Sequence, residues 1–130
     1  MLKKILFLLL VPSSAAIAAD GFSKANICKA AISSEMGRSV KTMKVLKSDA
    51  DMPEITYTRS DGQKYRYQCR FEGNKVIWRT YFNDHLKKGW GRWRDTDPND
   101  SIITYKLSGK NLELTNSSTG TTDSYKKNDF

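Results

Sequence analysis

Hydrophobic and polar residues alternate most strictly over Gln63–Phe71. One set of alternate positions holds apolar and aromatic side chains (Tyr65, Tyr67, Cys69 and Phe71), and the other holds polar ones (Lys64, Arg66, Gln68 and Arg70). Successive side chains of a β-strand point to opposite faces of the sheet. The pattern therefore predicts a strand whose aromatic face lies on the core and whose cationic face lies in solvent, in a sheet covered on one side only.

Short alternating runs of the same kind predict seven further strands. They are Val40–Lys47, Glu54–Arg59, Lys75–Phe82, Gly89–Arg94, Ser101–Leu107, Asn111–Asn116 and Thr121–Lys126. Turn-forming pairs such as Asp61-Gly62 and Gly73-Asn74 separate the runs. Connections this short join neighbouring strands in antiparallel order.

The segment before these strands has helical spacing instead. Its apolar residues fall on one narrow face (Ile27, Cys28, Ala31, Ile32 and Met36). Phe22-Ser23 fits a hydrophobic staple around a serine N-cap, and Gly37 stands where a helix would end. The order of one helix followed by strands predicts an α+β fold, with an N-terminal helix packed on a curved antiparallel sheet of six to eight strands. A small β-barrel capped by the helix is the alternative.

The two cysteines, Cys28 and Cys69, both fall on core-facing sides of their predicted elements, and we expect them to form a disulfide. Structural zinc normally takes four ligands, and His85 is the only histidine in the chain. Asp95–Asp100 resembles the start of a calcium loop, but Lys106 stands where that loop requires a bidentate glutamate. We therefore expect no metal site and no cofactor.

The amino terminus has the three parts of a cleavable bacterial secretory signal over Met1–Ala19. Two lysines are followed by the apolar run Ile5–Val11 and by small residues before the cleavage site. The apolar run is too short to span a bilayer, and no later segment is a candidate. We expect residues 20–130 to form a single compact α+β domain, exported to the periplasm or the medium. Cleavage lowers the formal charge from +8 to +6, which leaves a basic protein.

The group with the most functional potential combines arginines and tryptophans of three predicted strands. Its members are Arg66, Arg79, Trp90, Arg92, Trp93 and Arg94. A guanidinium beside an aromatic ring binds carboxylate or phosphate well, and Trp and Arg also dominate protein-binding hot spots. We expect the four arginines to lie close together on the exposed side of adjacent strands. The alternative is an ordinary solvated face, with the tryptophans in the core.

These features favour a non-catalytic exported binding protein that acts on a protein partner as inhibitor, immunity protein or adaptor. A binder of anionic polymers or surfaces, such as nucleic acid, lipopolysaccharide or acidic lipid, is the alternative. A small secreted hydrolase such as a nuclease, built on His85 with Glu72 or Glu113, is the second alternative, but no motif around His85 supports catalysis. Tyr67-Gln68-Cys69 resembles one strand of the bacterial periplasmic lysozyme inhibitors, and that likeness covers this strand alone.

Overall fold

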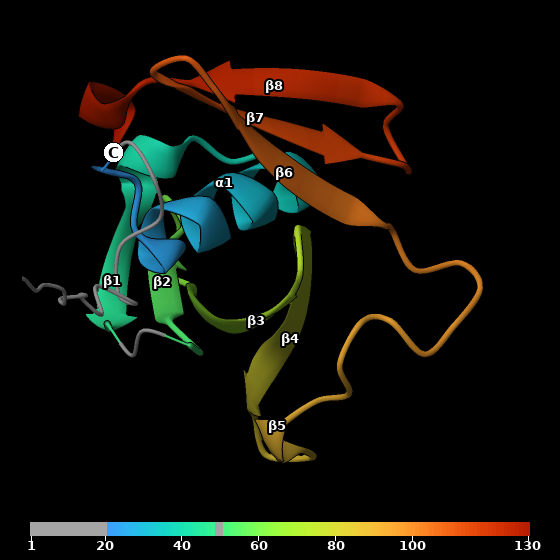
Figure 1. The fold of residues 1–130 in the computed structure, drawn as a ribbon. Coiled ribbons are helices and arrows are strands. Elements are labelled where there is room, and N and C mark those ends of the chain that lie inside the picture. Colours follow the sequence, from blue (N-terminus) through green and yellow to red (C-terminus); the bar gives the residue numbers. More distant parts are fainter. Residues whose placement is uncertain (1–20, 49–50) are drawn as a thin grey trace, which may run out of the picture.

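The computed structural model describes residues 21–48 and 51–130. Helix α1 (Lys24–Met36) lies in the hollow of an antiparallel sheet that curls around it, as Figure 1 shows. This arrangement confirms the predicted α+β fold with a curved sheet. The predicted signal peptide, Met1–Ala19, lies outside the described residues. Within the described ranges, no helix is both long and apolar enough to cross a membrane.

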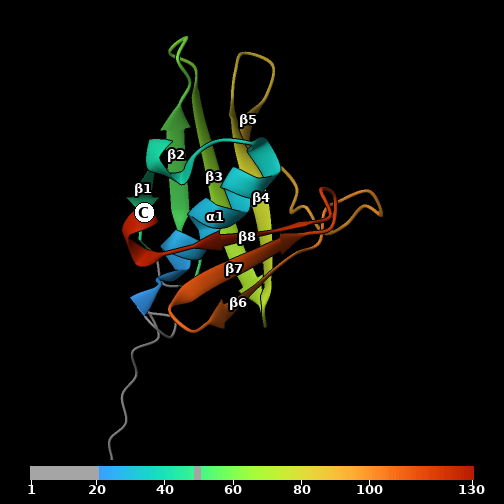
Figure 2. The same cartoon turned by 90° about the horizontal axis from the view of Figure 1, so that it is seen from above.

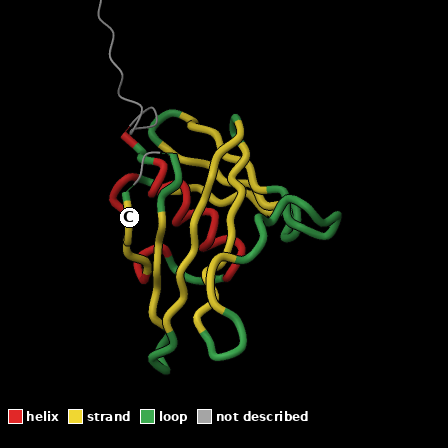
Figure 3. Tube along the Cα trace, turned by 90° about the horizontal axis from the view of Figure 1, so that it is seen from below, coloured by secondary structure: helices red, strands yellow, loops and turns green. Residues whose placement is uncertain are grey.

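Eight strands build the sheet, and all their pairings are antiparallel. The strands are β1 (Met43–Lys47), β2 (Glu54–Thr58), β3 (Lys64–Glu72), β4 (Lys75–Asn83), β5 (Lys88–Trp90), β6 (Ile103–Ser108), β7 (Asn111–Asn116) and β8 (Thr121–Tyr125). Their order across the sheet is β1-β2-β3-β4-β6-β7-β8, with β5 paired to β4. Strands β1 and β8 end this order without pairing to each other, so the sheet is an open half-barrel (Figure 3).

Helix α1 begins and ends as its sequence predicts. Ser23 Oγ accepts a hydrogen bond from Asn26 N, and Asn26 Oδ1 accepts one from Ser23 N, both at 3.1 Å. Gly37 ends the helix with a left-handed φ of 67°, which glycine adopts without a Cβ clash. The buried surface is wider than the predicted narrow face, because Ala25 and Ala30 are also buried. The curled sheet contacts the helix from several sides, so small residues are needed there.

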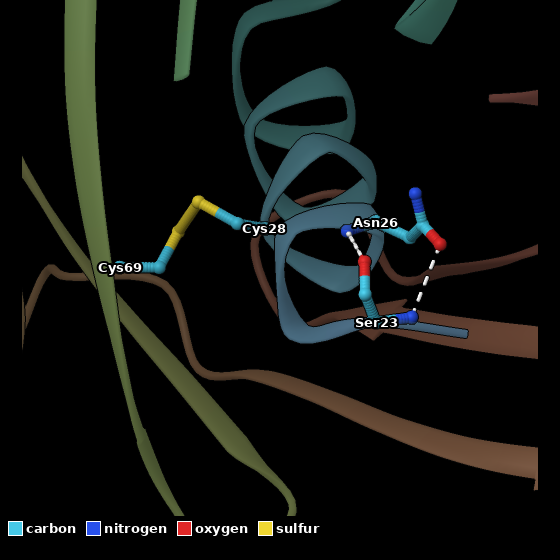
Figure 4. Close-up of a disulfide and its surroundings, with 4 residues drawn as sticks. All are labelled: Ser23, Asn26, Cys28 and Cys69. Atoms are coloured by element: carbon cyan, nitrogen blue, oxygen red, sulfur yellow. Dashed lines mark hydrogen bonds between the residues drawn. A yellow bond between two sulfur atoms is a disulfide. The ribbon is translucent and has the colours of Figure 1, made fainter. Parts of the chain in front are cut away.

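A disulfide joins Cys28 of α1 to Cys69 of β3, as predicted. Figure 4 shows the bond between the helix and the strand. The two Cα atoms lie 5.8 Å apart, and both side chains are fully buried. Trp78 stands opposite Cys69 on β4 and belongs to the same buried cluster. The helix is thus fixed covalently to the middle of the sheet.

Two predicted strands are shorter than expected by three residues each. Val40–Thr42 forms a 3₁₀ turn in which Ser39 Oγ accepts a hydrogen bond from Lys41 N, so β1 begins only at Met43. Of the predicted strand Gly89–Arg94, only the first two residues belong to a regular strand, β5, which ends at Trp90.

Beyond Trp90 the chain continues irregularly along the edge of β4. Gly91 N donates to Thr80 O at 2.8 Å, and the next bond runs from Arg94 N to Trp78 O at 2.9 Å. Three residues of this segment therefore advance against two of β4, which is the geometry of a β-bulge. A Cβ at Gly91 would lie 2.5 Å from Phe82 Cε2, so glycine permits this close approach.

Candidate functional site

The outer face of the sheet is the face turned away from α1. Strand register places Glu54 and Gln68 opposite each other on this face, and Ile77 further along it. Only 4% of Glu54, 6% of Gln68 and 2% of Ile77 is exposed, yet Ile77 is not part of the buried cluster around α1. The expectation that this face lies open to solvent is therefore wrong at its centre, where other side chains cover it.

Alternating guanidinium groups and indole rings form that cover. From one end to the other they are Arg66, Trp90, Arg79, Trp93 and Arg70, and we call this series the Arg/Trp ladder. The Arg79 guanidinium lies between two rings, 4.8 Å from the centre of Trp90 and 4.3 Å from that of Trp93. Each such contact contributes on the order of 0.5–2 kcal/mol, more where water is excluded.

Hydrogen bonds to side chains of the sheet fix two arginines of the ladder. Arg66 forms an ion pair with the buried carboxylate of Glu54, with its Nη2 2.7 Å from Glu54 Oε1. Arg79 donates from Nε and Nη2 to Gln68 Oε1, at 2.9 and 2.6 Å. Burial lowers the pKa of Arg79, while the charge of Glu54 acts in the opposite direction. These arginines are held in place by internal acceptors before any ligand is present.

Arg92 does not belong to the ladder. Its Nη1 and Nη2 donate to the two carboxylate oxygens of Asp100, at 2.7 and 2.9 Å. Asp100 also accepts hydrogen bonds from Thr96 N and Asp97 N. The bond from Arg92, followed by the backbone donors, holds the pKa of Asp100 well below its ordinary value despite some desolvation. This residue pair closes the loop Asp95–Asp100, whose sequence resembles the start of a calcium loop.

Lowering the pH is expected to weaken two ion pairs, Arg92 with Asp100 in this loop and Arg59 with Asp61 in the β2–β3 turn. Asp100 has a depressed pKa, and a hydrogen bond from Arg59 lowers the pKa of Asp61 to about 2. The stabilisation they give is complete above the unfolded value of about 3.9 and is lost as the pH falls toward the folded values.

Thermal melts from pH 6 to pH 2 of the wild type and of Asp100→Asn test this linkage. The difference in melting temperature between the two proteins should be largest at pH 6 and should shrink toward pH 2. Curves that stay parallel over the whole range would contradict the assignment.

Arg94 lies on the other side of the sheet. Its guanidinium carbon is 5.1 Å from the ring centre of Trp78, a core residue that faces α1. The bulge after Gly91 causes this placement, because the extra residue reverses the alternation of the following side chains. The prediction that Arg66, Arg79, Arg92 and Arg94 form one exposed cluster is thus wrong for the last two.

Of the six predicted binding residues, the structure brings four together in the Arg/Trp ladder: Arg66, Arg79, Trp90 and Trp93. It adds Arg70, which shares the cationic face of its strand and could have been included on that ground. It also adds Tyr81, whose ring centre lies 4.6 Å from the Arg66 guanidinium carbon and 5.2 Å from the centre of the Trp90 ring.

Beside the ladder, a groove of about 680 Å³ opens on the outer face. We call it the outer-face groove; it is lined mainly by Lys44, Thr56, Thr58, Lys64, Arg66 and Tyr81 and by residues 82–84. Its lining reaches the residues next to the β2–β3 turn and the β4–β5 turn. These two turns project from the same end of the sheet (Figures 2 and 3). Sequence reasoning missed this site, because its residues come from four strands and carry no common motif.

The lysines of the outer-face groove differ from the arginines beside them. No described residue forms an ion pair with Lys44 or Lys64, whereas Arg66 is paired with Glu54. Asp84, the one carboxylate that lines the groove, accepts hydrogen bonds from Leu86 N and Lys87 N at 2.8 Å. The groove therefore presents two lysines without an ion-pair partner and one carboxylate, which gives it a net positive charge.

His85 is exposed in the β4–β5 turn. Among the described residues, no three His, Cys, Asp or Glu side chains gather in a way that could hold a metal ion.

Comparisons of the chain with models of known protein families, with curated protein sequences and with solved structures gave no match.

Proposed function

We propose that this chain is an exported, non-catalytic binding protein that holds an acidic segment of a protein partner in the outer-face groove. An inhibitor, an immunity protein or an adaptor would act in this way. The observation that carries the proposal is the contrast between the paired arginines and the unpaired Lys44 and Lys64. A cation without an internal acceptor is free to pair with a carboxylate of a partner.

The surroundings of the groove fit a protein better than a polyanion. Leu46 lines the groove and is 49% exposed, and Leu86, in the adjoining turn, is 85% exposed. Apolar side chains beside charged ones are typical of protein interfaces. A nucleic acid would be expected to use the arginines, but five of the seven donate to internal side-chain acceptors. The disulfide is compatible with the export that the proposal assumes.

Binding of anionic polymers is the second candidate, because the whole chain carries a formal charge of +8. Such binding would draw on lysines over the entire surface and would weaken steeply with salt. Binding in one groove depends on particular lysines and responds less to salt.

Charge reversal in the groove separates these candidates. The variant Lys44→Glu/Lys64→Glu should capture a discrete polypeptide from periplasmic and culture fractions at least about tenfold more weakly than the wild type, since each 1.4 kcal/mol is a factor of ten. The control Lys75→Glu/Lys110→Glu makes the same charge change outside the groove and should capture normally.

Double-stranded DNA and anionic vesicles, tested with the same three proteins at two salt concentrations, complete the comparison. Binding of DNA or vesicles that weakens equally in both variants, with a steep salt dependence, would favour polyanion binding. Capture that is unaffected by the groove variant, or the lack of any polypeptide that depends on the groove, would contradict the proposal.

A further inference from the structure

Arg94 differs from the other arginines of the chain in its bonding. Five of the seven donate hydrogen bonds to side-chain acceptors: Arg59, Arg66, Arg70, Arg79 and Arg92. Arg38 and Arg94 donate none to the described residues, and each lies over an aromatic ring. Arg38 is exposed to solvent, whereas Arg94 is half-buried.

One donor atom of the Arg94 side chain is itself buried. Among the described residues that are not exposed, Arg94 Nε is the one buried side-chain nitrogen or oxygen atom without a hydrogen-bond partner. Nη1 and Nη2 are not buried in this way and have no acceptor among the described residues either. The two Nη groups of Arg94 are therefore the donors that a ligand can reach, whereas Nε is covered.

The setting of Arg94 suits recognition of an oxyanion. The backbone of Arg94 is held by the bond from Arg94 N to Trp78 O, and its guanidinium carbon lies 5.1 Å from the ring centre of Trp78. A guanidinium held against an indole presents its Nη atoms as a fixed fork, which matches the two oxygens of a carboxylate or phosphate. Partial burial strengthens this pairing, because water screens the charges less.

We propose that Arg94, supported by Trp78, is a binding site for a carboxylate or phosphate group, separate from the outer-face groove. The Nη atoms donate to the bound oxyanion. The site lies across the sheet from the Arg/Trp ladder, so it does not depend on the proposed function.

Titration of the wild-type protein with succinate and with inorganic phosphate, at constant ionic strength, tests this site. Arginine-selective ¹⁵N NMR follows the seven Nε–H signals, and the Arg94 signal is assigned by its loss in Arg94→Gln. We expect this signal to shift and saturate in the millimolar range with one of the two anions. The anion that gives the saturating shift shows whether the site takes a carboxylate or a phosphate. Unsaturated or equal shifts of all seven signals, or no shift with either anion, would overturn the proposal.

Thermal stability provides a second readout. A saturating anion should raise the melting temperature of the wild type and of Arg38→Gln, which removes the same charge from an exposed position. Arg94→Gln should show only the general salt effect. Without anion, Arg94→Met should melt at the wild-type temperature or higher, whereas Arg79→Met should melt lower. A strong loss of stability in Arg94→Met would assign Arg94 a structural role and contradict a ligand site.

The groove variant Lys44→Glu/Lys64→Glu should keep the anion response of Arg94. Failure of the oxyanion site and failure of the groove can therefore be recognised separately.

Discussion

Loss of the Cys28–Cys69 bond is expected to lower the free energy of unfolding by about 3–4 kcal/mol. The bond closes a loop between residues that are 41 positions apart, and without it the unfolded chain gains entropy. It also ties α1 to the sheet, and a helix of 13 residues is marginal by itself. Since small domains are stable by only about 5–15 kcal/mol, this loss removes a large part of the total.

Urea unfolding of the oxidised wild type, the reduced wild type and Cys28→Ala/Cys69→Ala measures this contribution. The reduced protein isolates the bond itself, because both sulfur atoms remain in the core. Equal unfolding midpoints for the oxidised and reduced proteins would contradict the expectation.

The replacement Asn116→Ala is expected to lower stability by about 2–3 kcal/mol, because it leaves buried polar groups without partners. Asn116 is fully buried, and its Nδ2 donates to Ser34 Oγ at 3.1 Å and to Glu35 Oε1 at 3.0 Å. Its Oδ1 accepts a hydrogen bond from Ser118 N at 2.9 Å. One side chain thus connects the last turn of α1 to the end of β7.

Asn111→Ala is the matched control for this change. Asn111 lies at the other end of β7, and its side chain forms no hydrogen bond with the described residues. Its loss should change the urea midpoint little. If Asn116→Ala unfolds at the same urea concentration as Asn111→Ala, the connection through Asn116 does not stabilise the fold.

The fold was largely predictable from local patterns. Alternation over Gln63–Phe71 placed Cys69 on the core side, and helical spacing placed Cys28 there too, so the disulfide followed from two local inferences. The caps at Ser23 and Gly37 likewise depend on neighbours in sequence. Such features need no knowledge of how distant segments meet.

The site was less predictable, because it depends on register and on one irregular segment. A regular strand would have placed Trp90, Arg92 and Arg94 on one face, but the bulge after Gly91 brings Trp90 together with Trp93 instead. The pairing of Glu54 with Arg66 follows from the register of β2 on β3, which composition does not encode. For the same reason, the sequence could not show that the arginines are paired while the groove lysines are not.

Site-specific photo-crosslinking in cells that export the protein tests the central proposal most directly. A photoreactive amino acid is placed at Thr58, which is exposed in the outer-face groove, or at Thr122, which is exposed on the edge strand β8. The account predicts a discrete crosslinked polypeptide from Thr58 that is absent from Thr122 and is lost when Lys44→Glu/Lys64→Glu is added. A crosslink from Thr122 alone, or one from Thr58 that survives the charge reversal, would contradict it.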